Sequence, residues 1–552
     1  MRLPGSRALL VAFGVLALAL GAARITLAAR LPVADFAFVN SAEPSSLDPA
    51  AASGVPEGRV LRFLFEGLCV KDPRTLEPAP GVAERWDVSP DGTLYTFHLR
   101  ADARWSNGDV VTAEDFRASF RRLLDPRTAA PYGALLWPVV GAREWSNRVD
   151  EHGESVRSFD DVAIRAIDAR TLAIELERPL PYFLDLLASP PCLPVHVRSI
   201  EASTARGVRH WTHPENLVTN GPYTLALRRV NDRLRFARSA TYWDARHVGF
   251  ATVDCLAVEH PVTALNLYLT GEVGWIDNPP PAVIPELAGR DDFRARPFLA
   301  TYFYRINVTR PPLDDRRVRR ALALTIDRSA ITEQVMRAGE RPAFGLVPPG
   351  ARDHDGVELA HARDADGFAI DVAEARALLV DAGYGTGGRA LPTVEIHYNN
   401  QGSHKDVAEI VADGWRKHLG IATRLLNQEW KVALDTQRTL GYQVSRSSWV
   451  ADHLDPIGFL EVFTSTSENN RTGFADARYD ALIERATRAR GSERRELLAD
   501  AERRLLEELP ILPVYFYVTR NLVDPRLDGF FDNALDEHPP KSWRWRAGAR
   551  GD

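Results

Sequence analysis

An acidic side chain, Asp452, ends the segment 446–452, which reads RSSWVAD and has the character of a short extended run. A carboxylate at the end of an exposed strand edge is suited to receive the ammonium group of an extended peptide whose backbone pairs with that edge. An aspartate after a strand also commonly serves as a turn residue or helix cap. The segment therefore indicates a peptide-binding edge only if the rest of the chain supports it.

Two other segments contain residue types that could do chemistry. Residues 383–388 satisfy G-x-G-x-x-G, but a dinucleotide-binding loop needs a strand before it and a helix after it. Here a capped helix precedes the glycines and a strand-like segment, 391–397, follows them. The second segment has acidic and imidazole groups, which are suitable ligands for divalent metal ions. The simpler interpretation is an acidic loop exposed to solvent. Its members are Asp353, His354, Asp355, Glu358, His361, Asp364 and Asp366.

The sequence has no motif of a catalytic nucleophile or a zinc-bound base. No G-x-S-x-G, S-x-x-K or H-E-x-x-H arrangement is present. Cys69, Cys192 and Cys255 have neither C-x-x-C spacing nor a nearby histidine pair, which excludes the usual metal cages. One disulfide or three free thiols both stay open. We expect a protein that is not an enzyme and that needs no cofactor or metal.

Length and composition are those of a soluble protein with several packed units. The 552 residues are several times the usual domain size of about 100–150. Hydrophobic residues make up 45% of the chain and charged residues 26%, which is ordinary for a globular protein. The formal net charge of −6 is spread without long like-charge blocks, so nothing in it favours nucleic-acid binding.

The N-terminus has the pattern of a secretory signal peptide. Arg2 and Arg7 precede an apolar run over residues 8–23, and alanine pairs at 22–23 and 28–29 offer cleavage sites. The run is somewhat shorter than the ~20 residues that span a bilayer comfortably. No cysteine follows it, so a lipoprotein anchor is not expected. Export to a periplasm is the expectation, with an uncleaved membrane anchor as the alternative.

Helix and strand signals alternate along the chain. Thr112 begins a helix with a capping-box-like start and an apolar stripe. Asp371 caps a second helix, which Gly383 ends. Strand-like alternation occurs over residues 161–167 and 171–176, separated by a short turn. These signals predict a mixed α/β protein with hairpins.

Nine short blocks resemble those of a known family in both residue type and order. They are NSAEPSSLDP at 40–49, LFEGL at 64–68, PGVAERW at 80–86, YTFHLR at 95–100, WSNG at 105–108, TNGPY at 219–223, RVRRAL at 317–322, NQEW at 427–430 and PVY at 513–515. The family is that of the peptide-binding proteins of bacterial ABC importers, which are large periplasmic or surface receptors for oligopeptides and dipeptides. The resemblance extends from about residue 36 to about residue 545.

This resemblance implies an α/β fold of the periplasmic-binding-protein type (class II), with two lobes that enclose the ligand by hinge closure. It further implies a monomeric periplasmic receptor that captures short peptides by their backbone and termini. Such a receptor delivers peptides to an ABC transporter permease in the inner membrane. The domain limits that it implies are a signal peptide or anchor at 1–29, lobe I at 30–65, 190–299 and 519–552, an inserted domain II at 66–189, and lobe II at 300–518.

Individual binding roles also follow from the resemblance. Asp452 matches the aspartate that pairs with the peptide α-ammonium, a charge-assisted bond of roughly 1.5–3 kcal/mol. Ser448 and Val450 match the strand that hydrogen-bonds the peptide backbone, and Gly54 and Val55 match an opposing segment of the first lobe. Backbone pairing does not depend on side-chain identity, so broad specificity is expected.

The remaining expected contacts involve positive and aromatic side chains. Arg446 and His404 match groups that meet the peptide α-carboxylate, with a packed or surface role as the alternative for each. Trp430, Trp449 and Tyr132 match aromatic residues that line side-chain pockets or the cleft wall. For these aromatic residues, burial in a core is the alternative.

The chain departs from the family pattern at two places. Ser53 stands where enteric oligopeptide receptors have a glutamate facing the ligand, so a preference for basic peptides is expected to weaken. Ala300 and Val450 take positions that a disulfide links in some relatives, so that bridge is missing. Two alternatives stay open: a narrower receptor for dipeptides or murein peptides, and an anchored peptide-responsive sensor without a transport role.

Overall fold

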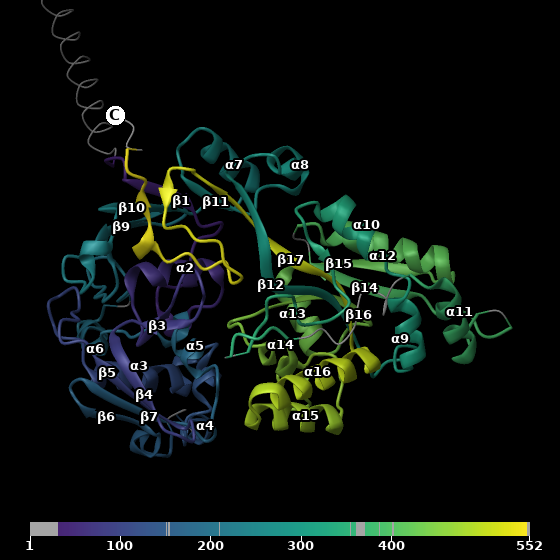
Figure 1. Cartoon of the computed structure of the whole chain (residues 1–552), viewed down its shortest axis with the longest axis horizontal. Helices are drawn as coiled ribbons and strands as arrows, with labels where there is room; N and C mark the ends of the chain where they lie inside the picture. Colours follow the sequence, from purple (N-terminus) through teal and green to yellow (C-terminus); the bar gives the residue numbers. More distant parts are fainter. Residues whose placement is uncertain are drawn as a thin grey trace, which may run out of the picture.

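Two long antiparallel strands, β12 (Phe293–Ile306) and β17 (Ile511–Val523), run through both halves of the molecule (Figure 1). Among the described residues they lie at the centre of an eleven-stranded sheet in the order β15-β14-β16-β12-β17-β11-β1-β10-β9-β8, with β13 (Arg341–Pro342) also pairing with β17. We call the half on the β11 side lobe I and the half on the β16 side lobe II. The computed structural model describes residues 31–150, 152, 155–208, 210–353, 355–359, 370–385, 387–399 and 402–548.

Lobe I is built on a mixed part of this sheet. Its strands are β1 (Phe36–Val39), β8 (Tyr223–Arg229), β9 (Arg233–Arg238), β10 (Thr252–Leu256) and β11 (Trp275–Asp277), and its helices include α2 (Val55–Leu64), α6 (Val197–Ala205) and α7 (Pro261–Leu269). β1 lies parallel to both β10 and β11. Stacked aromatic rings fill the space between β1 and α2, with Phe38 and Phe63 centroids 5.8 Å apart.

A smaller antiparallel sheet forms a separate unit at the lower left of Figure 1, which we call the inserted domain. Its strands are β4 (Ala83–Val88), β5 (Leu94–Leu99), β7 (Thr171–Glu175) and β6 (Ile164–Asp168), and beside them lie helix α3 (Ala113–Leu124) and the hairpin of β2 (Cys69–Lys71) and β3 (Pro78–Pro80). The helix predicted at Thr112 is confirmed as α3, with a complete capping box between Thr112 and Asp115. The predicted hairpin is confirmed as well, but β6 begins only at Ile164, because residues 159–161 form a 3₁₀ turn capped by Ser158.

Lobe II surrounds the other end of the long strands. Its elements include β14 (Val394–Asn399), β15 (Thr423–Gln428), β16 (Val444–Val450), α9 (Arg316–Ala323), α11 (Val372–Asp381), α12 (His404–Leu419), α13 (Trp430–Arg438), α14 (Ile457–Leu460), α15 (Ala477–Arg488) and α16 (Gly491–Glu508). The predicted cap of α11 is confirmed, since the Glu374 amide donates to the Asp371 carboxylate at 2.8 Å. Figure 1 shows α15 and α16 below the sheet, and α9, α11 and α12 on its right.

Hydrophobic packing connects the lobes. The largest cluster of buried apolar residues includes Phe38 of lobe I, Phe97 of the inserted domain and Leu498 of α16. A second cluster packs α9 and α12 onto β14 and β16, and the buried Trp415 indole donates to the Leu322 carbonyl at 3.0 Å within it. The first cluster shows that lobe II is in contact with the other two units.

The glycine-rich segment and the acidic segment have structural explanations. α11 precedes Gly383 and β14 follows the glycines, which is the reverse of a dinucleotide-binding turn. Asp353 is buried rather than solvated: it accepts from Arg495 at 2.7 Å and from the Val357 amide at 2.9 Å. The expectation of a solvated loop is therefore wrong for this side chain, because a single arginine neutralises it. His354, His361, Asp364 and Asp366 lie outside the described residues.

The cysteines and the N-terminus complete the comparison with the sequence. Cys69, Cys192 and Cys255 are buried free thiols, and burial raises the pKa of Cys192 to about 12. The predicted signal peptide or anchor at 1–29 lies outside the described residues. Within the part of the chain that the structure does describe, no helix has the length and apolarity of a membrane span.

Candidate functional site

The outer edge of β16 is open over its second half. β14 pairs with it only at Val444 and Ser445, while β12 pairs with it along its whole length. The Ala451 amide donates to Leu299 directly across on β12, at 2.9 Å. Since hydrogen-bonded and non-bonded pairs alternate in an antiparallel ladder, the backbone groups of Ser448 and Val450 point away from β12. These are the two residues predicted to bind a peptide backbone, and both lie on the open edge.

The neighbouring residues define how far this edge extends. The Gln437 amide group donates to the Arg446 carbonyl at 2.9 Å, so the edge is occupied there by α13. Val450 is exposed and Ser448 is half-buried. Ala300 and Val450 are direct cross-strand partners. This pairing is expected, because the two residues take the positions that a disulfide links in some relatives. The edge that can accept another strand therefore extends from Ser448 to the end of β16.

Asp452 lies two residues beyond the end of β16. Its side chain is accessible to water, yet its pKa is raised, first by the removal of hydration by surrounding protein, against the lowering influence of Lys71. The residue is therefore exposed to water while other protein groups lie around its carboxyl group, with the charges of Lys71 and Glu537 acting on it. Such a carboxylate gains more from a cation than an open surface carboxylate does, because water screens the interaction less.

Contacts with the other two units lie beside Asp452. The Lys71 ammonium of β2 donates to the Asp452 carbonyl at 2.7 Å. Tyr132 precedes a short 3₁₀ turn of the inserted domain. Its pKa is raised by burial and then by the charges of Asp452 and Glu57, the latter at the start of α2. Asp452 of lobe II therefore faces both the inserted domain and lobe I.

Arg446 and His404 lie together around one tyrosine ring. The Arg446 guanidinium lies 4.9 Å from the Tyr302 ring centroid and donates to the Tyr517 hydroxyl at 2.9 Å. The His404 ring is 5.6 Å from the same Tyr302 ring. Among the described residues, no carboxylate forms an ion pair with Arg446. An arginine that is half-buried without a carboxylate partner is a ready site for an anion.

His404 differs from the expectation of a positive group. Burial, and then the charge of Arg446, lower its pKa to about 3. The imidazole is therefore neutral near pH 7 in this structure, and Arg446 is the positive member of the pair. A neutral imidazole can still donate one hydrogen bond to a carboxylate.

The aromatic residues divide into two kinds. Trp430 is 42% exposed and Tyr132 is 38% exposed, so neither is a core residue. Trp449 is half-buried, packs against the main hydrophobic cluster, and donates from its indole to the Gly458 carbonyl at 2.7 Å. The exposed surfaces of Trp430 and Tyr132 could contact a ligand. Trp449 is instead held in place by the hydrophobic cluster and by its hydrogen bond.

Gly54 and Val55 are exposed where α2 begins, and Ser53 precedes them. Gly54 has φ of +114° and ψ of 170°, a conformation that glycine tolerates and L-residues rarely adopt. No hydrogen bond joins Gly54 or Val55 to lobe II within the described residues. The structure thus brings Asp452 near Tyr132 and Arg446 near His404. It shows no direct contact between these residues and Gly54 or Val55 among the described hydrogen bonds.

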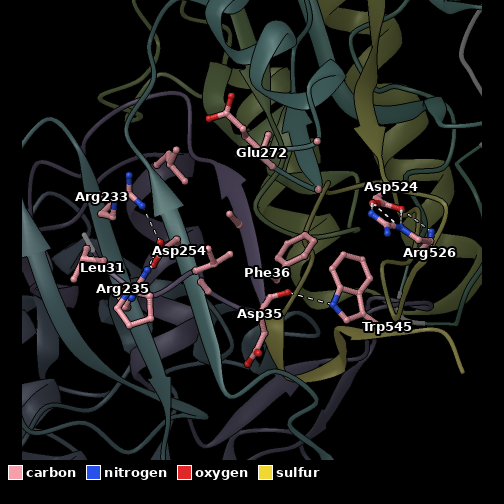
Figure 2. Close-up of a pocket in the computed structure, with 18 residues that line it drawn as sticks. Leu31, Asp35, Phe36, Arg233, Arg235, Asp254, Glu272, Asp524, Arg526 and Trp545 are labelled. Carbon is pink, nitrogen blue, oxygen red and sulfur yellow. Dashed lines mark hydrogen bonds and ion pairs between the residues drawn. The ribbon is translucent and has the colours of Figure 1, made fainter. Parts of the chain in front are cut away.

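A separate concavity of about 360 Å³ lies on lobe I, away from β16 (Figure 2). Figure 2 shows Arg233 and Arg235 pointing at Asp254, with Arg235 bonded to it at 2.6 and 2.7 Å. Asp524 and Arg526 form another internal pair, at 2.7 Å. Asp35 and Glu272 also line the concavity: the Asp35 carboxylate accepts from the Ala251 and Thr252 amides, and the Glu272 carboxylate accepts from the Thr270 hydroxyl.

Sequence reasoning missed several residues around the site. Lys71 and its partner Glu537 lie 3.2 Å apart beside Asp452, and Tyr517 holds Arg446. A faint signal for Lys71 was available, because it is one of only five lysines in a chain with 68 basic residues. Nothing in the sequence marks Glu537 or Tyr517.

Comparison with known proteins gives a consistent result. A model described as "Bacterial extracellular solute-binding proteins, family 5 Middle" matches residues 77–471. The chain is 38% identical over 536 residues to the periplasmic oligopeptide-binding protein OppA of Escherichia coli (strain K12), covering 94% of this chain and 95% of that protein. The solved structure of the Escherichia coli murein tripeptide binding protein MppA has a TM-score of 0.79, with 33% identity and coverage of 93% of this chain and 99% of that one.

A further solved structure, that of Haemophilus influenzae OppA in complex with RPPGFSPFR, has a TM-score of 0.76 and 31% identity, with 93% of this chain and 100% of that chain covered. These likenesses span nearly the whole chain and confirm the two-lobed α/β fold predicted from the sequence. The chain therefore belongs to the bacterial extracellular solute-binding proteins of family 5.

Proposed function

We propose that this protein is a periplasmic receptor that captures short peptides and delivers them to an ABC transporter permease. The observation that carries the proposal is the open edge of β16, with the exposed carboxylate of Asp452 just beyond the end of the strand. The similar proteins from Escherichia coli and Haemophilus influenzae are named for binding oligopeptides or murein peptides. The proposal assigns no catalytic activity to the protein.

A peptide would bind as an added strand. Its main-chain groups would pair with those of Ser448 and Val450, and its α-ammonium would meet the Asp452 carboxylate. A peptide oriented this way runs antiparallel to β16. The charge-assisted bond to Asp452 orients the peptide, while the backbone bonds accept any side-chain sequence.

The opposite end of the peptide would meet Arg446, with His404 as a neutral donor beside it. Positions 446 and 452 are about 20 Å apart along a strand at about 3.3 Å per residue. Because the side chains at both ends reach inward, peptides of about three to five residues fit this span. Trp430 and Tyr132 would contact the peptide side chains, and Gly54 and Val55 would pair with the peptide from lobe I.

We infer that closure occurs at the long strands. The pairing of β12 with β17 changes register between Pro297 and Thr301, opposite residues 516–518 of β17. This irregular stretch lies at the proposed boundary between lobe I (30–65, 190–299 and 519–552) and lobe II (300–518), with 66–189 as the inserted domain. Bending of the two strands at this stretch would bring the lobes together as rigid bodies.

The binding role is tested by Asp452→Asn, measured by calorimetric titration with trialanine and with N-acetyl-trialanine. We expect the variant to bind trialanine roughly 10- to 100-fold more weakly, because the countercharge is lost while the shape is kept. The acetylated peptide lacks the ammonium, so the variant and the parent should bind it alike. Asp435→Asn, which removes an exposed carboxylate on α13, serves as the control. Equal affinity of Asp452→Asn and parent for trialanine would refute the role.

The alternative function is that of a receptor with a narrower range of ligands, either dipeptides or murein peptides. The similarity to the murein tripeptide binding protein MppA supports this alternative. A panel of dipeptides, trialanine and murein tripeptide in the same titration separates the two. A general receptor binds the ordinary peptides with similar affinities. Binding of murein tripeptide alone would establish the narrower role.

A further inference from the structure

One lysine joins three parts of the chain beside the proposed ammonium site. Lys71 belongs to β2 of the inserted domain, and its side chain is only 4% exposed. Its ammonium donates to the Asp452 carbonyl of lobe II at 2.7 Å and to Glu537 near the C-terminus at 3.2 Å. The first of these bonds crosses between lobe II and the rest of the molecule.

The other side of this contact is firmly held. Glu537 also pairs with Arg62 of α2 at 2.7 Å. The Glu537 backbone amide and carbonyl both bond the Asn533 side chain, at 3.1 and 2.7 Å. Lys71 is therefore held in place by lobe I. Its hydrogen bond to the Asp452 carbonyl holds that part of lobe II near lobe I.

The choice of acceptor matters for ligand binding. Lys71 bonds the backbone carbonyl of Asp452, and among the described residues no ion pair joins it to the Asp452 carboxylate. A lysine on the carboxylate would compete with a peptide ammonium. A lysine on the carbonyl orients the residue and leaves the carboxylate oxygens without a direct ion pair to it, although its charge still lowers the Asp452 pKa.

We propose that Lys71 is a positioning residue that holds the backbone of Asp452 against lobe I and the inserted domain, so that the carboxylate meets the peptide ammonium when the lobes are together. The proposal rests on the proposed role of Asp452 in peptide binding. Lys71 itself does not touch the peptide. Its loss lets the segment after β16 move away and shortens the lifetime of the complex.

The simpler explanation is that Lys71 only neutralises Glu537. The two explanations differ in the double variant Lys71→Met with Glu537→Gln. If Lys71 serves Glu537 alone, removing both charges restores the affinity for peptide. If Lys71 acts through the Asp452 carbonyl, the double variant binds as weakly as Lys71→Met.

The experiment measures equilibrium affinity and dissociation rate for trialanine and N-acetyl-trialanine with the full exported protein. We expect Lys71→Met to bind trialanine at least about 10-fold more weakly, mainly through faster dissociation, since most mutational effects on affinity are in that rate. The affinity for N-acetyl-trialanine should change by less, because it has no ammonium to position. Lys541→Met removes a lysine that pairs with Asp244 within lobe I and serves as the control.

Three results would overturn the proposal: a Lys71→Met affinity within twofold of the parent, equal losses for both peptides, or full recovery in the double variant. Weak binding by Asp452→Asn with normal binding by Lys71→Met overturns the positioning role alone. Normal binding by Asp452→Asn instead overturns the ammonium site, and the positioning role with it. If Lys71→Met folds poorly, Lys71→Leu, which also lacks a donor, replaces it with the same expected results.

Discussion

Replacing Glu461 by glutamine should stabilise the protein at pH 8 and have a much smaller effect at pH 5. Glu461 follows α14 in lobe II, and its carboxylate accepts from the Tyr182 hydroxyl of the inserted domain at 3.4 Å. Burial, and then the charge of Asp455, raise its pKa to about 7 from an ordinary 4.5. Ionisation of the Glu461 side chain therefore lowers the free energy of unfolding, because the charge lies where lobe II contacts the inserted domain.

The sign of the effect follows from proton linkage. A carboxyl whose pKa is higher in the folded chain than in the unfolded chain holds its proton more tightly when folded. Stability therefore falls as pH rises from about 4.5 to about 7, and the loss is complete above pH 7. The difference in pKa corresponds to at most about 3 kcal/mol, and partial exposure of the side chain reduces this to about 1–2 kcal/mol.

The assay is denaturant unfolding of the parent and Glu461→Gln at pH 5 and pH 8. Glutamine keeps an oxygen that can accept from Tyr182, and all other titrating groups are common to both proteins. We expect a midpoint increase equivalent to about 1–2 kcal/mol at pH 8 and a much smaller one at pH 5. Glu484→Gln, at a site where the side chain is 60% exposed, is the matched control and should show neither change. An equal increase at both pH values, or none at pH 8, would refute the reasoning.

Three further substitutions have definite expected outcomes. Arg494→Met leaves the carboxylate of Asp455 without its fully buried partner at 2.9 Å, so unfolding should become easier by about 3–5 kcal/mol; a loss below 1 kcal/mol in denaturant titration would contradict this. Gly221→Ala places a Cβ 2.6 Å from the carbonyl carbon of Leu64, and the thermal midpoint should fall by the equivalent of about 1–3 kcal/mol, whereas an unchanged midpoint would show that the backbone can move apart. Arg446→Met should weaken trialanine binding by about 10-fold and binding of trialanine amide by much less; equal losses in titration would exclude a carboxylate contact.

Local signals in the sequence were sufficient for elements that depend on neighbouring residues. The start of α3 was predictable because its capping box joins Thr112 to Asp115, three positions away. The start of β6 was not, because the turn capped by Ser158 competes with the strand pattern. The central pairing of β12 with β17 joins residues as distant as Thr301 and Phe516, and no local pattern records which strands will meet.

The candidate site shows the same division. Asp452 could be predicted as a candidate because it ends a short, recognisable segment, and the strand expected before it is present as β16. Lys71 lies 381 positions from Asp452 along the chain, so their bond exists only after three units have packed together. The neutral state of His404 likewise depends on burial and on Arg446, which a sequence motif does not reveal.

The most direct measurement of the central claim is the thermal unfolding midpoint of the protein with trialanine and with N-acetyl-trialanine, each at a few millimolar. A ligand that binds only the folded state stabilises it by about 2.7 kcal/mol at a concentration one hundred times its Kd. A peptide receptor that recognises the ammonium at Asp452 should show a clear increase with trialanine and little with the acetylated form. Equal increases with both peptides, or no increase with either, would contradict it.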